Sequence, residues 1–197
     1  MATVYWPADL FPAAVDYGIE YDVQVTVRRS GAVHTYGLPG ARWVASLAFG
    51  NDTEGDNRPR TEALVASLRG GARRISMPHL GRPVPNGDLR GTPVLGSAAA
   101  PGHNAIEIAQ ATGGVRKGDI LGVAGQLLMM EQDAAPTAGR MWVAVSPAVR
   151  ISAPAGQPVV WNRPEALWIP RNSTAGPFPF APGGIRPGFS LELVEVP

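Results

Sequence analysis

The three histidines, His34, His79 and His103, are the side chains best suited to metal binding or proton transfer. They are far apart in the chain, and no pair has the His-x-x-x-His or His-x-Glu spacing that places two ligands on one element. Cysteine is absent, which excludes thiolate catalysis, disulfide bonds and cysteine-ligated zinc. The sequence therefore predicts isolated histidines on the surface or in loops, with no metal site and no cofactor.

A nucleophilic serine is not indicated either. The motif Gly-x-Ser-x-Gly is missing, and the nearest candidate, residues 96–98, lacks the second glycine. Asp88, Asp119 and Asp133 stand beside turn residues, where Asp commonly caps backbone N–H groups. No glycine-rich phosphate-binding motif occurs. We therefore expect a protein that is not an enzyme, with a hydrolase site built from distant residues as an alternative.

Tryptophan offers a different chemistry, because an exposed indole can stack on carbohydrate or anchor a protein contact. Of the five tryptophans, Trp43 and Trp168 fall in alternating patterns that favour the core. Trp6 lies in an N-terminal arm and is the best candidate for contact with another chain. A carbohydrate- or receptor-binding β module is thus a second possible function.

The composition favours short strands and tight turns. The 197 residues include 24 glycines and 20 prolines, which disfavour helix interiors. The net charge of +1 gives no electrostatic reason to bind nucleic acid. No apolar run approaches the roughly 20 residues that span a bilayer, and residues 1–12 do not have the pattern of a signal peptide. We expect no membrane association.

The elements that would position any site are mostly strands. Alternating apolar residues predict a three-stranded meander over 19–49, with its first strand half-buried. One helix is expected near 60–69, because Leu64, Val65 and Leu68 share a face and Gly70 and Gly71 end it. Closing strands are expected at 166–169 and 189–196, with Ser190, Glu192 and Glu195 on the solvent side.

Glycine and proline mark the domain boundaries. Residues 78–102 lose periodicity and are expected to form a Pro/Gly-rich connection. Residues 103–163 contain short strands with glycine at the corners, which is typical of a small β-barrel. The predicted fold is therefore an antiparallel β-sandwich or split-barrel domain with one packed helix, formed by 1–77 plus 164–197, and an inserted small β-barrel module.

Several segments, in order along the chain, resemble one family. They are Trp6–Leu10, Ser30–Val33, Leu38–Trp43, Glu62–Gly70, Gly118–Asp119, Gly125–Leu127, Ala138–Met141, Pro147–Arg150 and Phe189–Glu195. Together they are similar to the distal tail and related tail-tip proteins of long-tailed bacteriophages with non-contractile tails. The likeness extends over nearly the whole chain.

The resemblance implies a structural role in the virion. Such proteins form a ring, commonly of six copies, between the tail tube and the tip hub, without an active site. The implied partners are further copies of this chain, the tail tube protein, the tip hub and the tail fibre proteins. The implied location is the phage tail tip, assembled in the host cytoplasm. At 197 residues the chain differs from longer members, which add a large C-terminal receptor- or sugar-binding domain.

Four side chains are the expected contacts between copies. Trp6 and Leu10 lie in the N-terminal arm, and Phe178 and Phe180 lie in the Gly/Pro-rich loop 177–187. Each is a large apolar group without an evident local partner, and such groups often mark interfaces.

Overall fold

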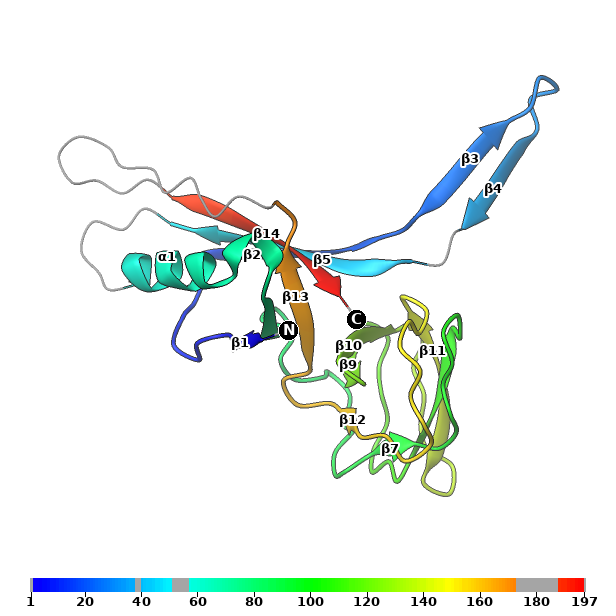
Figure 1. The fold of residues 1–197 in the computed structure, drawn as a ribbon. Helices are drawn as coiled ribbons and strands as arrows, with labels where there is room; N and C mark the ends of the chain where they lie inside the picture. Colours follow the sequence, from blue (N-terminus) through cyan, green and yellow to red (C-terminus); the bar gives the residue numbers. More distant parts are fainter. Residues whose placement is uncertain (1, 38–39, 51–56, 173–187, 197) are drawn as a thin grey trace.

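The computed structural model of the chain describes residues 2–37, 40–50, 57–172 and 188–196. In these residues the chain forms mostly β-strands and one α-helix, so the predicted mainly β class is confirmed. The strands make two six-stranded sheets and one two-stranded sheet. Figure 1 shows the larger two as adjoining bodies and the third as a separate projection.

The first six-stranded sheet joins the two ends of the chain. In spatial order its strands are β1 (Thr3–Tyr5), β6 (Arg74–Pro78), β13 (Glu165–Pro170), β14 (Phe189–Val196), β5 (Arg42–Phe49) and β2 (Ala14–Glu20). Only β1 and β6 run parallel, and all other neighbours are antiparallel. On β5, Trp43, Ala45 and Leu47 are buried at every second position. Alternate residues of a strand share one face, so these three point to the same side of the sheet.

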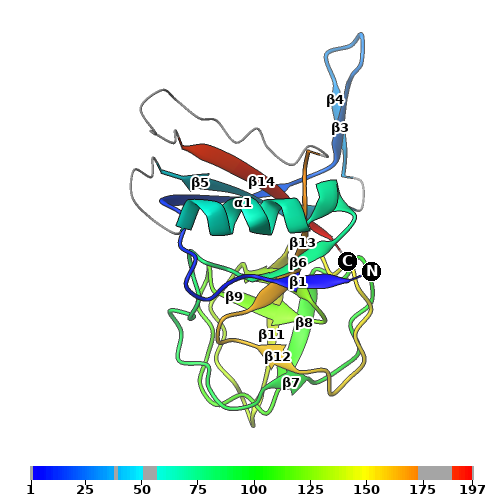
Figure 2. The same ribbon diagram turned by 60° about the vertical axis from the view of Figure 1, so that its left-hand side comes forward.

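A single α-helix packs on part of that apolar face. Helix α1 (Asn57–Ser67) buries Leu64 and Val65, and Leu68 directly after it is also buried, as its apolar spacing predicts. The short 3-10 helix η1 (Arg69–Gly71) follows, with Gly70 in a left-handed conformation. Figure 2 shows α1 lying along the sheet. The same core includes two barrel residues, Ile120 and Leu127, so the sheet packs against both the helix and the barrel.

The second six-stranded sheet curls into a nearly closed barrel. Its order is β12 (Val159–Val160), β9 (Ile120–Val123), β10 (Gln126–Met130), β11 (Arg140–Ser146), β8 (Ala105–Ala109) and β7 (Val94–Leu95). A bridge between Val94 and Pro158 brings the first and last strands together. The interior is a core of its own, made largely of aliphatic side chains.

Residues 78–102 are more than a connection. Strand β7 lies within this range, and Leu89 and Leu95 are fully buried in the barrel core. The barrel therefore begins before residue 103, where the sequence placed its start. Glycine and proline mark tight corners here, and the periodicity is lost because the buried residues are separated by turns.

The expected meander over 19–49 is confirmed only in part. Its first hairpin forms, because β3 (Val23–Val27) pairs with β4 (Val33–Gly37) across the expected turn at 28–31. The strand expected from residue 19 is interrupted at Tyr21 and Asp22, and among the described residues β4 does not pair with β5. Strand β5 instead lies between β2 and β14. Pairing of β5 with a strand near the end of the chain is a long-range contact, which local alternation does not encode.

A substitution at Leu89 tests whether the segment 78–102 is packed. Leu89→Ala removes a fully buried side chain from the barrel core and should lower the free energy of unfolding by about 2–5 kcal/mol. Val84→Ala, in the same segment at a position that is 48% exposed, is the control and should change it by less than about 1 kcal/mol. Urea unfolding measures both free energies. Equally small changes for the two variants would mean that the segment is not packed into the barrel core.

Candidate functional site: a projecting arm and the joint behind it

The most unusual feature of the structure is an arm made of β3 and β4. The two strands pair from Val23 with Gly37 to Val27 with Val33. A turn joins them, in which the Arg28 amide donates to the Ala32 carbonyl and Gly31 has a positive φ of 80°. Both figures that show the whole chain place this hairpin away from the rest of the protein (Figures 1 and 2). Among the described residues, the two strands of the arm thus pair only with each other.

One face of the arm is apolar and uncovered. Val23, Val25 and Val27 alternate along β3, and Val33 stands opposite Val27 in the register. Their exposed fractions are 45%, 61%, 66% and 60%. The sequence predicted a half-buried strand here, but every residue of β3 is exposed. Alternation identifies an apolar face without identifying what covers it.

The base of the arm is tied to the barrel. Between β2 and β3, the hydroxyl of Tyr21 lies 2.7 Å from the hydroxyl oxygen of Ser146 at the end of β11. This hydrogen bond links the point where the chain leaves the sheet to a strand of the other body. It therefore helps to fix the direction in which the arm projects.

Behind the arm, a buried carboxylate joins the sheet to the barrel. Glu195 on β14 is 1% exposed and accepts hydrogen bonds from the backbone amides of Trp43 (3.2 Å) and Leu127 (2.8 Å). Arg150 forms an ion pair with the same carboxylate. The expectation that Glu195 faces solvent is wrong, because its partners come from three other parts of the chain.

The charge state of this joint follows from its surroundings. Burial raises the pKa of the Glu195 carboxyl, whereas Arg150 and the two amide donors oppose that rise. The Trp43 indole also donates to the Leu127 carbonyl at 2.9 Å. Three hydrogen bonds thus cross between β5, β10 and β14 at this point, and the ion pair adds Arg150 from the segment after β11.

His79 lies in a loop after β6, as the sequence predicted, but it is neither isolated nor at the surface. It is 3% exposed and stacks on Tyr17, with ring centroids 3.9 Å apart. Its Nδ1 accepts a hydrogen bond from the Arg82 amide at 3.0 Å. Burial lowers the pKa of His79 to about 4 and raises that of Tyr17 to about 12. Both rings are therefore neutral at pH 7 and act as packing groups.

The other histidines are separate from His79 and from each other. His34 is half-buried on the arm, and His103 is exposed in a loop, where its Nδ1 accepts from the Ala100 amide at 3.4 Å. Among the described residues, no group of three or more His, Asp or Glu side chains could hold a metal ion.

Two of the four expected contact residues have partners within their own chain. Trp6 is 8% exposed and Leu10 is 1% exposed, and the Trp6 indole donates to the Leu10 carbonyl at 3.0 Å. Both belong to the core between the sheet and α1, so the premise that they lack a local partner is wrong. Phe178 and Phe180 lie outside the described residues. Trp43 and Trp168 are buried, as predicted.

The sequence pointed to aromatic residues and missed the arm valines. Their signal was present as alternation over 23–27 next to the turn of Arg28 and Arg29. Alternating valines occur both in strands whose apolar face is covered by the same chain and in strands whose apolar face contacts another chain. The pattern alone therefore does not distinguish these two cases.

The pH dependence of stability provides a test of the buried His79. Between its ordinary pKa of 6.5 and its folded value of about 4, the unfolded chain binds a proton that the folded chain does not. Stability should therefore be fully present above pH 6.5 and fall towards pH 4, by up to about 1.4 kcal/mol per pH unit. His79→Gln should flatten this slope, while His103→Gln should keep it. Urea unfolding between pH 4 and 8 measures the slopes, and identical slopes would contradict the assignment.

A second test concerns the joint. Glu195→Ala leaves the largely buried Arg150 guanidinium without its counter-ion and should cost about 3–5 kcal/mol of unfolding free energy. Glu192→Ala removes an exposed carboxylate from the same strand and is the matched control, expected to cost under about 0.5 kcal/mol. Thermal and urea unfolding measure both, and a Glu195 variant as stable as the control would show that the joint does not hold the two bodies together.

Comparison with models of protein families and with curated proteins found no match to this chain. No helix in the described part of the chain is both long and apolar enough to cross a membrane.

Proposed function

We propose that this chain is a structural virion protein of a phage tail tip, similar to distal tail proteins, and that it has no enzymatic activity. In this proposal it is one subunit of a homo-oligomeric ring of six copies that joins the tail tube to the tip hub or fibres. The order of the resembling segments along the sequence supports the family, and the projecting arm supports the assembly.

The exposed valine face of the arm is the observation that carries the proposal. A two-stranded hairpin on its own is marginally stable in water, and this one exposes four valines. Full burial of one valine side chain contributes about 1.5–3 kcal/mol. Contact with another chain would therefore stabilise the arm and the assembly together.

The position of the arm fits a head-to-tail contact. The arm projects from the side of the sheet where β2 and β5 lie. Its valine face differs from the surface of the neighbouring subunit's body that it would contact. Contacts between unlike surfaces are heterologous, and they close into rings when the rotation between subunits permits. Residues Arg28 and Arg29 at the exposed tip add positive charge, which suits an acidic rim on the neighbouring subunit or on another tail protein.

The β2 edge of the large sheet supplies further contact surface. Strand β2 is an outermost strand, so one of its sides has no paired strand in the described structure. Such edges present backbone N–H and C=O groups to a neighbour. A ring subunit needs complementary surfaces of this kind and no catalytic centre.

Polar substitution on the arm tests the ring. We expect the purified wild type to form a discrete multimer, and Val25→Asp combined with Val27→Asp to yield monomers, because the charges oppose burial of the face. Val84→Asp, at an exposed valine outside the arm, is the matched control and should assemble normally. Native mass spectrometry and negative-stain electron microscopy give the copy number.

A milder pair of substitutions distinguishes loss of the contact between subunits from unfolding of the hairpin. Val25→Thr with Val27→Thr keeps the branched shape that strands favour, and should weaken assembly less than the aspartates do. Far-ultraviolet circular dichroism checks that each monomer remains folded. A wild type that stays monomeric at high concentration and is absent from tails, or an aspartate pair that assembles normally, would overturn the proposal.

A further inference from the structure

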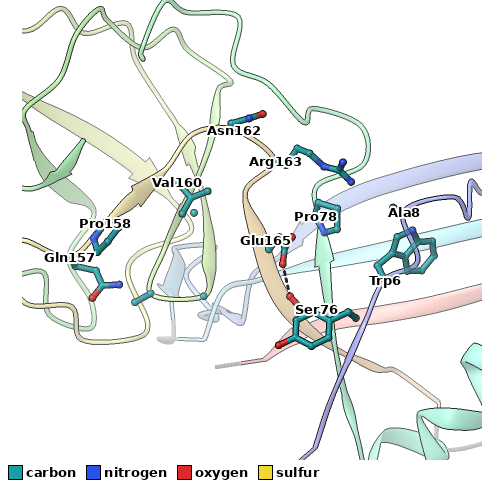
Figure 3. Close-up of a pocket in the computed structure, with 14 residues that line it drawn as sticks. Trp6, Ala8, Ser76, Pro78, Gln157, Pro158, Val160, Asn162, Arg163 and Glu165 are labelled. Atoms are coloured by element: carbon teal, nitrogen blue, oxygen red, sulfur yellow. Dashed lines mark hydrogen bonds between the residues drawn. The ribbon is translucent and has the colours of Figure 1, made fainter. Parts of the chain in front are cut away.

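An open cleft lies where the edge of the large sheet meets the barrel, with a volume of about 770 Å³. Figure 3 shows Gln157, Pro158 and Val160 of the barrel across from Ser76 and Glu165 of the sheet. Tyr5, Asn162 and Arg163 also line it. We propose that this cleft binds a neutral saccharide.

Tyr5 supplies an aromatic platform. It ends the edge strand β1 and is 73% exposed, although the neighbouring Trp6 is buried in the core. Within β1, Val4 packs against that core, and successive strand residues point to opposite faces, so Tyr5 is turned away from the core. A pyranose ring has a face of C–H groups, and such a face packs on an aromatic ring while its hydroxyls remain at the edge. Val160, 44% exposed, adds apolar surface on the barrel side.

Polar groups line the same cleft. The Ser76 hydroxyl donates to Glu165 Oε2 at 2.7 Å, which fixes the carboxylate while its other oxygen remains able to accept. The side-chain amides of Gln157 and Asn162 each offer donors and an acceptor, and Arg163 offers donors alone. Sugar hydroxyls both donate and accept, so this mixture matches them.

The cleft lacks the excess positive charge that would attract an anion. Arg163 and Glu165 are the charged residues among those that line it, and their formal charges cancel. A phosphate or nucleic acid site would carry an excess of Arg or Lys. A purely apolar ligand would leave the amides and the carboxylate without partners. A neutral, hydroxyl-rich ligand satisfies both conditions.

The backbone of the cleft is held in a conformation that costs energy. Ala124 and Arg163, both in its lining, have positive φ values of 51° and 50°, which non-glycine residues adopt rarely. The Arg163 amide donates to the Pro83 carbonyl at 2.6 Å, and this bond holds the turn. Such conformations persist where the surrounding structure imposes them, often at ligand sites. Here they place Arg163 at the cleft.

The residues present indicate binding without hydrolysis. Glycoside hydrolysis generally uses two carboxyl groups about 5–10 Å apart on either side of the scissile bond. Glu165 is the one carboxylate that lines this cleft. The proposal adds an attachment role to the ring and does not depend on it, because the lining comes from a single copy of the chain.

An array of neutral hexose and N-acetylhexosamine oligosaccharides, with sulfated and phosphorylated glycans beside them, tests this with the purified full chain. Retained neutral glycans are then titrated by calorimetry. We expect Tyr5→Ala to weaken binding by about tenfold and Tyr5→Phe to change it by less than about threefold, because the ring is kept. Val160→Trp should abolish binding by filling the cleft.

Trp142→Ala is the matched control, because it removes an aromatic side chain that is 60% exposed on barrel strand β11, outside the cleft lining. It should bind as the wild type does. The pair Val25→Asp and Val27→Asp should also bind normally, which separates failure of this proposal from failure of the ring. No retained neutral glycan, a preference for the charged glycans, or binding that survives both Tyr5→Ala and Val160→Trp would overturn the assignment.

Discussion

The structure depends on the buried carboxylate of Glu195. Isolated in an apolar interior, an ionised carboxylate would be costly, and this one is compensated by two backbone amides and Arg150. The amides belong to β5 and β10, so a single side chain on β14 satisfies donors from the sheet and from the barrel. Removing the Glu195 side chain takes this acceptor from both backbone amides and the counter-ion from Arg150. The joint therefore resists separation of the two bodies even though each has its own core.

The same joint positions the functional surfaces. Where β5 begins, the Trp43 amide and indole are held by Glu195 and by the Leu127 carbonyl. The arm returns to the sheet just before this strand, and Tyr21 holds its other leg to Ser146 of the barrel. On the far side, the His79 amide donates to the Pro164 carbonyl at 3.0 Å, beside the turn that carries Arg163. Barrel and sheet therefore constrain both the arm and the cleft.

Sequence patterns predicted elements well and partners poorly. The helix with Leu64 and Leu68, the strand 189–196 and the buried Trp43 all follow from local periodicity. Pairing of β5 with β14 does not, because strand order is decided by packing between segments distant in the chain. Glu195 shows the limit most clearly. As a charged residue it is usually at the surface, and only its three partners, none close in sequence, make burial acceptable.

Of the candidate site, the sequence showed the alternating valines without their role, and it did not single out the aromatic residue at position 5. The valines invert the usual expectation, since they are apolar and exposed, whereas Glu195 is charged and buried. Val4 and Tyr5 show the same contrast between neighbours, because β1 turns Val4 towards the core and Tyr5 towards solvent. Single-residue exposure is thus set by which face of a strand meets another layer, and that is a property of the assembled fold.

The arm and the cleft belong to opposite edges of one sheet. The arm leaves from the side of β2 and β5, while Tyr5 of the cleft lies on β1, the other outermost strand. Five inter-strand spacings separate β1 from β2, which corresponds to about 24 Å at about 4.8 Å each. A contact made by the exposed valines of the arm therefore does not require the cleft of the same subunit to be covered. The sheet can support assembly at one edge and keep a polar cleft with an exposed aromatic ring at the other.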